Sequence, residues 1–138
     1  ENSPTLTFNK IGRHISQIVK TKIITNNSPW LLSFEIGETF DIPVSHGEGR
    51  FYASDKVLKQ LFENGQIATQ YVNFDLEATN EFRFNPNGSS FAIEGIISPD
   101  GRIFGKMGHS ERYSKDTFKN IDGNKNQNLI LNGIKYFK

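Results

Sequence analysis

The sequence predicts a mixed α/β domain that is rich in strands and has one central and one C-terminal helix. Three observations lead to this class. Several short segments are rich in β-branched residues or alternate apolar with polar residues, as strands do; residues 55–64 have the periodicity of an amphipathic helix; and residues 127–137 have that of a second helix. The order of these elements fits an α+β fold or part of an α/β sheet, and the pattern alone does not choose between them.

Two segments in the first half of the chain predict strands. Residues 15–25 are rich in β-branched side chains, which favours a strand. Phe40, Ile42 and Val44 alternate with less apolar residues, as in a half-buried strand. Because Pro43 cannot donate to a ladder, this second strand is expected at a sheet edge or close to its own end.

The central helix has clear signals at both ends. Ser54 is the expected N-cap of a helix at residues 55–64, and Gly65 is placed to stop it. Four apolar residues share one face of this helix: Val57, Leu58, Leu61 and Phe62. Residues 55–64 are therefore the best amphipathic helix in the chain.

The second half predicts three more strands and the closing helix. The expected elements are a strand at 67–72, a loop at 73–80, a turn at 85–88, a hairpin of strands 91–97 and 102–107, a polar loop at 110–126 and a helix at 127–137. Pro99 and Gly101 suit a type I turn between the hairpin strands. The closing helix is expected to bury Leu129, Ile130, Ile134 and Phe137.

Composition limits the partners of this chain. The 138 residues are enough for one domain and too few for two, so residues 1–138 are expected to form a single domain. A net charge of +1 provides no basic surface for nucleic acid or an anionic membrane, and no apolar run has the length of a membrane span. We therefore expect neither partner, and a cytoplasmic location is the default.

The sequence contains no cysteine and begins with Glu1 rather than Met. Without cysteine the chain has no disulfide, no thiolate metal site and no cysteine nucleophile of its own. The first residue favours a fragment of a longer protein.

Two segments place a histidine and a glutamate two residues apart, each where a strand is expected to end: His46 with Glu48, and His109 with Glu111. A histidine beside a carboxylate is the base half of a nucleophilic triad, because one ring nitrogen takes the nucleophile's proton while the carboxylate orients the other. The same spacing also arises by chance in solvated loops with an incidental ion pair.

Other interpretations of these residues stay open. None of Ser45, Ser89 and Ser110 lies in a nucleophile elbow, so no triad is complete within the chain. If the two loops converge, their histidines and glutamates could instead bind one zinc, iron or manganese ion. His14 has no carboxylate nearby in sequence, so it is expected to be structural or on the surface.

Three segments, in this order and at this spacing, carry a resemblance to a known family. They are residues 43–51 (PVSHGEGRF), 83–89 (RFNPNGS) and 98–112 (SPDGRIFGKMGHSER). Together they closely resemble the end of the large, single-chain form of phosphoribosylformylglycinamidine synthase, and the resemblance covers nearly the whole chain. It implies the C-terminal part of a class I glutamine amidotransferase domain, with a three-layer, flavodoxin-like fold and a largely parallel central sheet.

The resemblance also implies roles for particular residues. The family triad is Cys-His-Glu, which makes His109 the base and Glu111 its orienting partner. The family motif usually has proline where this sequence has Ser110, a change that keeps the spacing. The family's cysteine lies upstream, before the segment seen here. The first His/Glu loop resembles the segment that lines the glutamine pocket with backbone groups, so four residues are candidate substrate contacts: Ser45, His46, Gly47 and Glu48.

The implied reaction is hydrolysis of glutamine to glutamate and ammonia. A separate synthetase region of the same parent chain then uses ammonia and ATP to convert formylglycinamide ribonucleotide to the amidine in purine biosynthesis. No metal or cofactor is expected in this chain, whereas ATP and magnesium are expected in the synthetase part. The partners expected are glutamine, the synthetase region and the upstream half of the domain, with self-association of the isolated chain. A metal-dependent enzyme and a non-catalytic interaction domain of amidotransferase shape are the alternatives.

We predict that the 138-residue chain alone releases no ammonia from glutamine, because it has no thiolate to attack the carboxamide. An ammonia assay on the purified chain checks this. Ammonia release that disappears in a His109→Ala variant would contradict it.

Overall fold

The computed structural model describes residues 3–114 and 121–137, and its main feature is a five-stranded sheet in the order β3-β2-β5-β6-β7. The strands are β2 (Ile15–Ile23), β3 (Thr39–His46), β5 (Ile67–Tyr71), β6 (Ile93–Ile97) and β7 (Phe104–Lys106). A second sheet pairs β1 (Thr5–Thr7) with β4 (Arg50–Tyr52). Every pairing among the described strands is antiparallel, so the largely parallel sheet expected of the parent domain is not among them.

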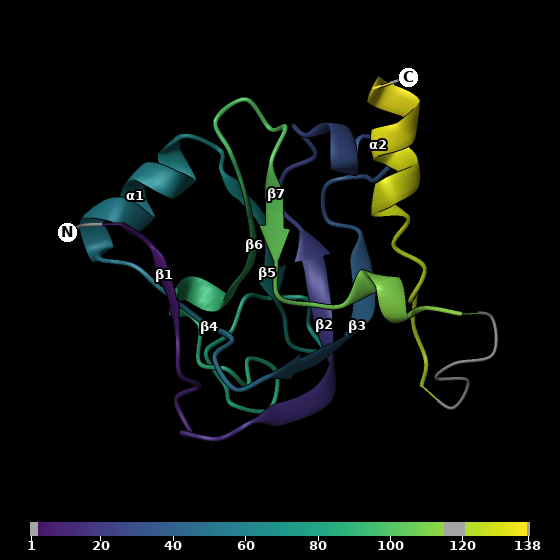
Figure 1. The fold of residues 1–138 in the computed structure, drawn as a ribbon. Helices are drawn as coiled ribbons and strands as arrows, with labels where there is room; N and C mark the ends of the chain where they lie inside the picture. The colour runs from purple at the N-terminus through teal and green to yellow at the C-terminus, as the bar shows by residue number, and fades with distance from the viewer. Residues whose placement is uncertain (1–2, 115–120, 138) are drawn as a thin grey trace.

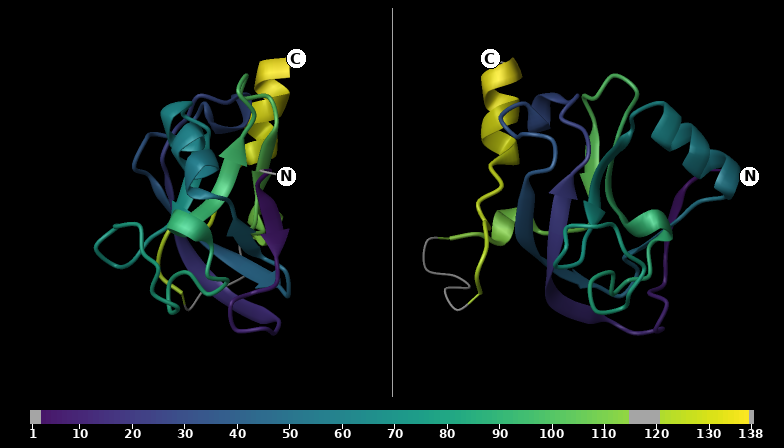
Figure 2. Two further views of the ribbon diagram at one scale, coloured as in Figure 1. Left: turned by 90° about the vertical axis from the view of Figure 1, so that its left-hand side faces the viewer. Right: turned by 180° about the vertical axis from the view of Figure 1, so that it is seen from behind.

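Two α-helices flank the main sheet, α1 (Asp55–Glu63) and α2 (Leu129–Phe137). Figures 1 and 2 show them at opposite ends of the sheet, α1 beside the β1–β4 pair and α2 beside β3. Three short 3₁₀ helices complete the described chain: η1 (Pro29–Leu31), η2 (Ser90–Ala92) and η3 (Ser110–Arg112). The mixed, strand-rich class with a central and a C-terminal helix is therefore confirmed. Among the described residues, neither helix has the length and apolar character needed to cross a bilayer.

β3 occupies one edge of the sheet, as Pro43 predicts. It pairs with β2 over eight positions, from Ile15 opposite His46 to Lys22 opposite Thr39. The strand therefore continues through Ser45 and His46, which were expected to lie in a loop. The outer side of an edge strand leaves carbonyl groups free for other partners.

The core packs against both faces of the sheet. All five residues of β5 are buried, which requires cover on both sides. One cluster joins the β2–β3 pair to η1, and its members are Ile23, Leu31, Phe34, Phe40, Ile42, Ala68 and Ile97. A second joins α1 to the sheet and comprises Phe51, Ala53, Leu58, Leu61, Ile67 and Ile93, and a third comprises Val19, Val44, Tyr71 and Ala92.

The central helix has the ends predicted from sequence. The Ser54 hydroxyl accepts a hydrogen bond from the Val57 N–H, as an N-cap does. Gly65 follows the helix with a φ of 66°, a left-handed conformation that glycine adopts without strain. Leu58 and Leu61 are buried in the core, whereas Phe62 is 41% exposed.

The predicted hairpin is also present, with a later start. β6 pairs with β7, and the Gly101 N–H donates to the Ser98 carbonyl at 2.8 Å across the turn. The first strand begins at Ile93 rather than at Phe91. Phe91 and Ala92 have φ values of 50° and 55°, which are incompatible with a strand. The polar loop predicted at 110–126 lies partly outside the described residues.

The face of α2 that packs on the protein differs from the one predicted. Ile130, Ile134 and Phe137 are 67%, 55% and 53% exposed, and the buried helix residues are Asn132 and Gly133. Leu129 is partly buried against the core, as expected. The apolar periodicity correctly indicates a helix, but it does not determine which side approaches the sheet.

Close approach to Trp30 decides the orientation of α2. A Cβ atom at Gly133 would lie 2.1 Å from Cζ3 of Trp30, so only glycine permits this contact. Asn132 Nδ2 donates to the Trp30 carbonyl at 2.9 Å, and the Trp30 indole N–H donates to the Arg102 carbonyl at 2.8 Å. These polar bonds hold the ring and the helix in one arrangement.

We predict that Gly133→Ala lowers the free energy of unfolding by about 1–2 kcal/mol, because overpacking against Trp30 exceeds the helix stabilisation of about 0.5–1 kcal/mol that alanine brings. Trp30 is the single tryptophan, so urea unfolding followed by its fluorescence measures both stability and helix docking. The control is Ile134→Ala, which should change stability by less than about 0.5 kcal/mol. A Gly133→Ala protein of higher stability with unchanged emission would contradict the packing argument.

Candidate active site

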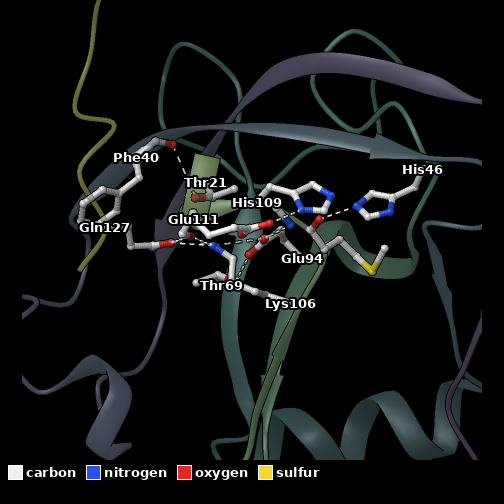
Figure 3. Close-up of polar contacts among 12 residues, drawn as sticks. Thr21, Phe40, His46, Thr69, Glu94, Lys106, His109, Glu111 and Gln127 are labelled. Atoms are coloured by element: carbon white, nitrogen blue, oxygen red, sulfur yellow. Dashed lines mark hydrogen bonds and ion pairs between the residues drawn. The ribbon is translucent and has the colours of Figure 1, made fainter. Parts of the chain in front are cut away.

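The segment after β7 lies across the end of β3 and is attached to it by backbone hydrogen bonds. The Met107 N–H donates to the Glu94 carbonyl at 3.0 Å, which extends the β6–β7 hairpin by one pair. The His109 N–H then donates to the Pro43 carbonyl at 2.8 Å on the edge strand. Two elements that are far apart in sequence therefore place His109 beside His46 (Figure 3).

His109 and Glu111 form a hydrogen-bonded pair. Nδ1 of His109 lies 2.6 Å from Oε1 of Glu111, and η3 supplies the turn that brings the carboxylate back to the ring. Burial alone raises the pKa of Glu111, but the hydrogen bond to His109 and the charges of His109 and Arg112 together hold it below its ordinary value. The carboxylate is therefore ionised at neutral pH, and it favours a proton on Nδ1.

The other ring nitrogen of His109, Nε2, lies on the opposite side of the ring from Glu111. Nε2 is buried and has no hydrogen-bond partner in the part of the chain that the structure describes. With Nδ1 protonated toward Glu111, Nε2 carries the lone pair. This is the arrangement of a general base whose orienting carboxylate is in place.

His46 packs its ring on that of His109. The ring centroids are 4.8 Å apart and the planes differ by 14°. Nε2 of His46 lies 2.5 Å from the Met107 carbonyl, so it carries the proton and donates. Burial lowers the pKa of His46, and the charges of His109, Arg112 and His14 lower it further against the opposing effect of the Met107 bond. His46 is thus a neutral ring that supports one face of His109.

The rest of the first His/Glu loop is organised by Asn9. The buried Asn9 side chain donates to the His46 carbonyl at 2.6 Å and accepts from the Gly49 N–H at 3.0 Å. The Asn9 N–H donates to the Gly47 carbonyl at 3.0 Å. The Gly49 N–H is thereby used, whereas the carbonyls of His46 and Gly47 each keep a second lone pair that a ligand could use. Sequence reasoning missed Asn9, which has no motif around it.

The structure brings three of the four paired residues together and leaves one apart. His46, His109 and Glu111 are neighbours, whereas Glu48 is exposed. The described residues contain no group of three or more side chains suited to a metal ion. Stacked rings also direct their lone pairs along nearly parallel planes, which does not suit one shared ion. The metal interpretation therefore receives no support here.

Ser45 and His14 bond to each other at the margin of the site. The His14 ring is exposed, and its Nε2 lies 3.1 Å from the Ser45 hydroxyl. The surface position expected for His14 is confirmed.

A cavity of about 630 Å³ opens beside the His109–Glu111 pair. Its walls come from His46, β7, the 107–111 segment and residues 126–131. A cavity of this size next to an oriented base can hold a small substrate. A histidine oriented by a carboxylate beside a cavity is a feature of the class of proteins that carry out nucleophilic catalysis.

Comparison with known proteins narrows this class. Residues 1–138 match the model of the family described as CobB/CobQ-like glutamine amidotransferase domain. The chain therefore belongs to this family of glutamine amidotransferase domains.

Individual relatives support this family assignment. The chain is 36% identical over 118 residues to "Phosphoribosylformylglycinamidine synthase subunit PurQ" of Methanosarcina barkeri, covering 86% of this chain and 50% of that protein. A protein of the same name from Chlorobium chlorochromatii is 45% identical over 87 residues, or 63% of this chain and 36% of that one. A solved structure titled "Structure of PurLQS from Thermotoga maritima" matches with a TM-score of 0.70 and 27% identity, over 99% of this chain and 54% of that chain. The chain thus spans about half the length of the relatives it matches.

We predict that His46 makes stability depend on pH. Its pKa lies below the ordinary value of 6.5, so between those two values the unfolded chain binds a proton that the folded chain does not. Stability is therefore expected to fall as the pH is lowered from about 7.5 to about 5.5. The lowered pKa of Glu111 has the same sign but acts below its ordinary value of 4.5, outside this window.

Urea midpoints at the two pH values measure this dependence. His46→Gln keeps an N–H donor for the Met107 carbonyl and should show a smaller fall than the wild type. His14→Gln is the matched control. Equal falls in wild type and His46→Gln would show that His46 is not the titrating group.

Proposed function

We propose that this chain supplies the general base of a glutaminase, with His109 as the base and Glu111 as its orienting partner. The observation that carries the proposal is the 2.6 Å bond from His109 Nδ1 to Glu111, combined with a buried Nε2 that has no partner among the described residues. Membership of a glutamine amidotransferase family supports the substrate.

The nucleophile must come from outside these 138 residues, since they contain no cysteine. We propose a cysteine in an upstream half of the domain, as the resemblance implies. Its thiol would give its proton to His109 Nε2 and attack the carboxamide carbon of glutamine. The protonated His109 would return the proton to the departing nitrogen, releasing ammonia and leaving a thioester that water hydrolyses to glutamate. The isolated chain is inactive in this scheme.

The ammonia would serve phosphoribosylformylglycinamidine synthesis. The relatives bear that enzyme's name, and the structural neighbour is titled as PurLQS, so a synthetase partner for this chain is a proposal drawn from them. ATP and magnesium would belong to the synthetase part. The relatives are named as a subunit, so the single-chain arrangement, the fragment status, self-association and the cytoplasmic location all stay predictions.

The glutamine itself is proposed to occupy the cavity beside His109. The His46 side chain lies on the wall of that cavity. Ser45, Gly47 and Glu48 stay candidates for substrate contact through groups that Asn9 does not already bond. Loss of affinity with retained kcat is the signature expected of a binding role.

The test uses the intact protein that contains this chain, treated with an electrophilic glutamine analogue and analysed by peptide mass spectrometry. We expect a single adduct on an upstream cysteine, formed at least 100-fold more slowly in His109→Ala, because positioned proton transfer contributes about 10²–10⁴ in rate. Glu111→Gln should slow the reaction while the fold is retained. The matched control is His14→Ala, which removes an exposed histidine and should react at the wild-type rate.

No adduct on an intact, folded protein would contradict the glutaminase. That outcome would favour a non-catalytic interaction domain of the same shape. An adduct formed equally fast in His109→Ala would retain a reactive cysteine but remove His109 from the role of base.

A further inference from the structure

A buried pair of opposite charges lies directly beneath the His109 segment. Nζ of Lys106 is 3.6 Å from Oε1 of Glu94, and their side chains are 10% and 0% exposed. Figure 3 shows the two side chains between His109 and Gln127. Neither residue belongs to the His–Glu pairs, and the proposed reaction does not use either of them.

Glu94 holds the residue before His109. Its Oε1 accepts a hydrogen bond from the Gly108 N–H at 2.7 Å, and its other oxygen accepts from the Thr69 hydroxyl. Its backbone carbonyl accepts from the Met107 N–H at 3.0 Å. One residue of β6 therefore fixes two successive residues on the way to His109.

Lys106 holds the residue after His109. Its ammonium donates to the Ser110 hydroxyl at 2.7 Å and to Oε1 of Gln127 at 2.5 Å. The Ser110 hydroxyl also donates to Gln127, at 2.6 Å. The Lys106–Ser110–Gln127 triangle closes over the turn that carries Glu111.

The backbone at Gly108 is closely surrounded by other residues, so no side chain fits there. A Cβ atom there would lie 2.7 Å from Cγ2 of Ile42 and 2.8 Å from Oε1 of Glu94. The backbone thus passes directly over the carboxylate. With the His109 N–H bonded to the Pro43 carbonyl, each residue from 107 to 110 has its own fixed partner.

A buried ion pair is a poor choice for stability alone. Two charges lose their hydration on burial, and apolar residues of the same volume often stabilise a core as well or better. Burial also lowers the pKa of Lys106, although the carboxylate of Glu94 opposes that effect. Charge-assisted hydrogen bonds instead constrain geometry, because each one specifies where a backbone or hydroxyl group must lie.

We propose that Glu94 and Lys106 are positioning residues for His109: the carboxylate fixes Gly108 and the ammonium fixes Ser110, so the imidazole is held where its Nδ1 meets Glu111. The catalytic part of this inference rests on the glutaminase proposed above. Misplacement of a catalytic group by about 1 Å can cost about 100-fold in rate, so loss of either anchor should act on chemistry.

The first experiment measures glutamine hydrolysis by the intact protein. Glu94→Gln and Lys106→Met keep the side-chain volume and each remove one charge; the double variant removes both. We expect kcat to fall about 10–100-fold in all three, with KM within about two-fold of the wild-type value. The matched control is Lys20→Met, which breaks another lysine–carboxylate pair, with Asp41 at 3.0 Å, and should leave kcat unchanged.

Thermal unfolding separates positioning from simple stability. The double variant should melt higher than either single variant, because neither charge is left buried without its partner. Under the proposal its kcat stays low even so. If kcat recovers together with the melting temperature, or if the single variants keep wild-type kcat, the pair is merely structural and the proposal is overturned.

A second readout does not depend on the glutaminase. In the ¹⁵N-labelled 138-residue chain, ring signals of His109 report the proton on Nδ1 and its bond to Glu111. We expect these signals to move toward those of a free imidazole in Lys106→Met and in the double variant, and to stay in place in Lys20→Met. Unchanged His109 signals would overturn the positioning role, even if the intact protein proved to hydrolyse no glutamine.

Discussion

The buried carboxylate of Glu94 connects three separate parts of the structure at the candidate active site. A charge with no exposed surface must be satisfied from every side, and here the partners are Thr69, Lys106 and the Gly108 N–H. Two of these partners lie just before His109 in the chain, since Lys106 ends β7 and Gly108 precedes His109 directly. The cost of burying one charge is thereby offset through bonds that also order the candidate active site.

The edge position of β3 provides the second support. Pro43 has no N–H to donate, but its carbonyl is free on the outer side of the sheet and accepts from the His109 N–H. Three residues further along the same strand, His46 stacks on the His109 ring and donates to the Met107 carbonyl. The free edge of β3 could pair with another strand. Here it bonds instead to the loop that carries His109, so the edge of the sheet forms part of the candidate site.

The sequence predicted the His109–Glu111 pair but did not identify the buried Glu94–Lys106 pair beneath it. The His109–Glu111 spacing indicated an oriented base, and the structure shows that bond. The signal for Glu94 was present as well, since a glutamate inside the apolar run of residues 93–97 has to be paired or neutralised when buried. The sequence could not identify the partner of Glu94, because Lys106 reaches it only through the register of the β6–β7 hairpin. Gln127 in turn reaches Lys106 only because of where the segment before α2 lies.

The sequence by itself determined the local structure: strand-forming residues, the Ser54 cap, the turn at Gly101 and the two helices all follow from propensity, periodicity and turn chemistry acting over a few residues. Tertiary structure decided what those elements face. α2 buries Asn132 and Gly133 rather than its apolar stripe, because only the glycine face can approach Trp30. His46 meets His109, while Glu48 remains exposed, because strand pairing and the bonds of Asn9 set the direction of that loop. Contacts between distant segments depend on shape and register, and these exist only after the chain has folded.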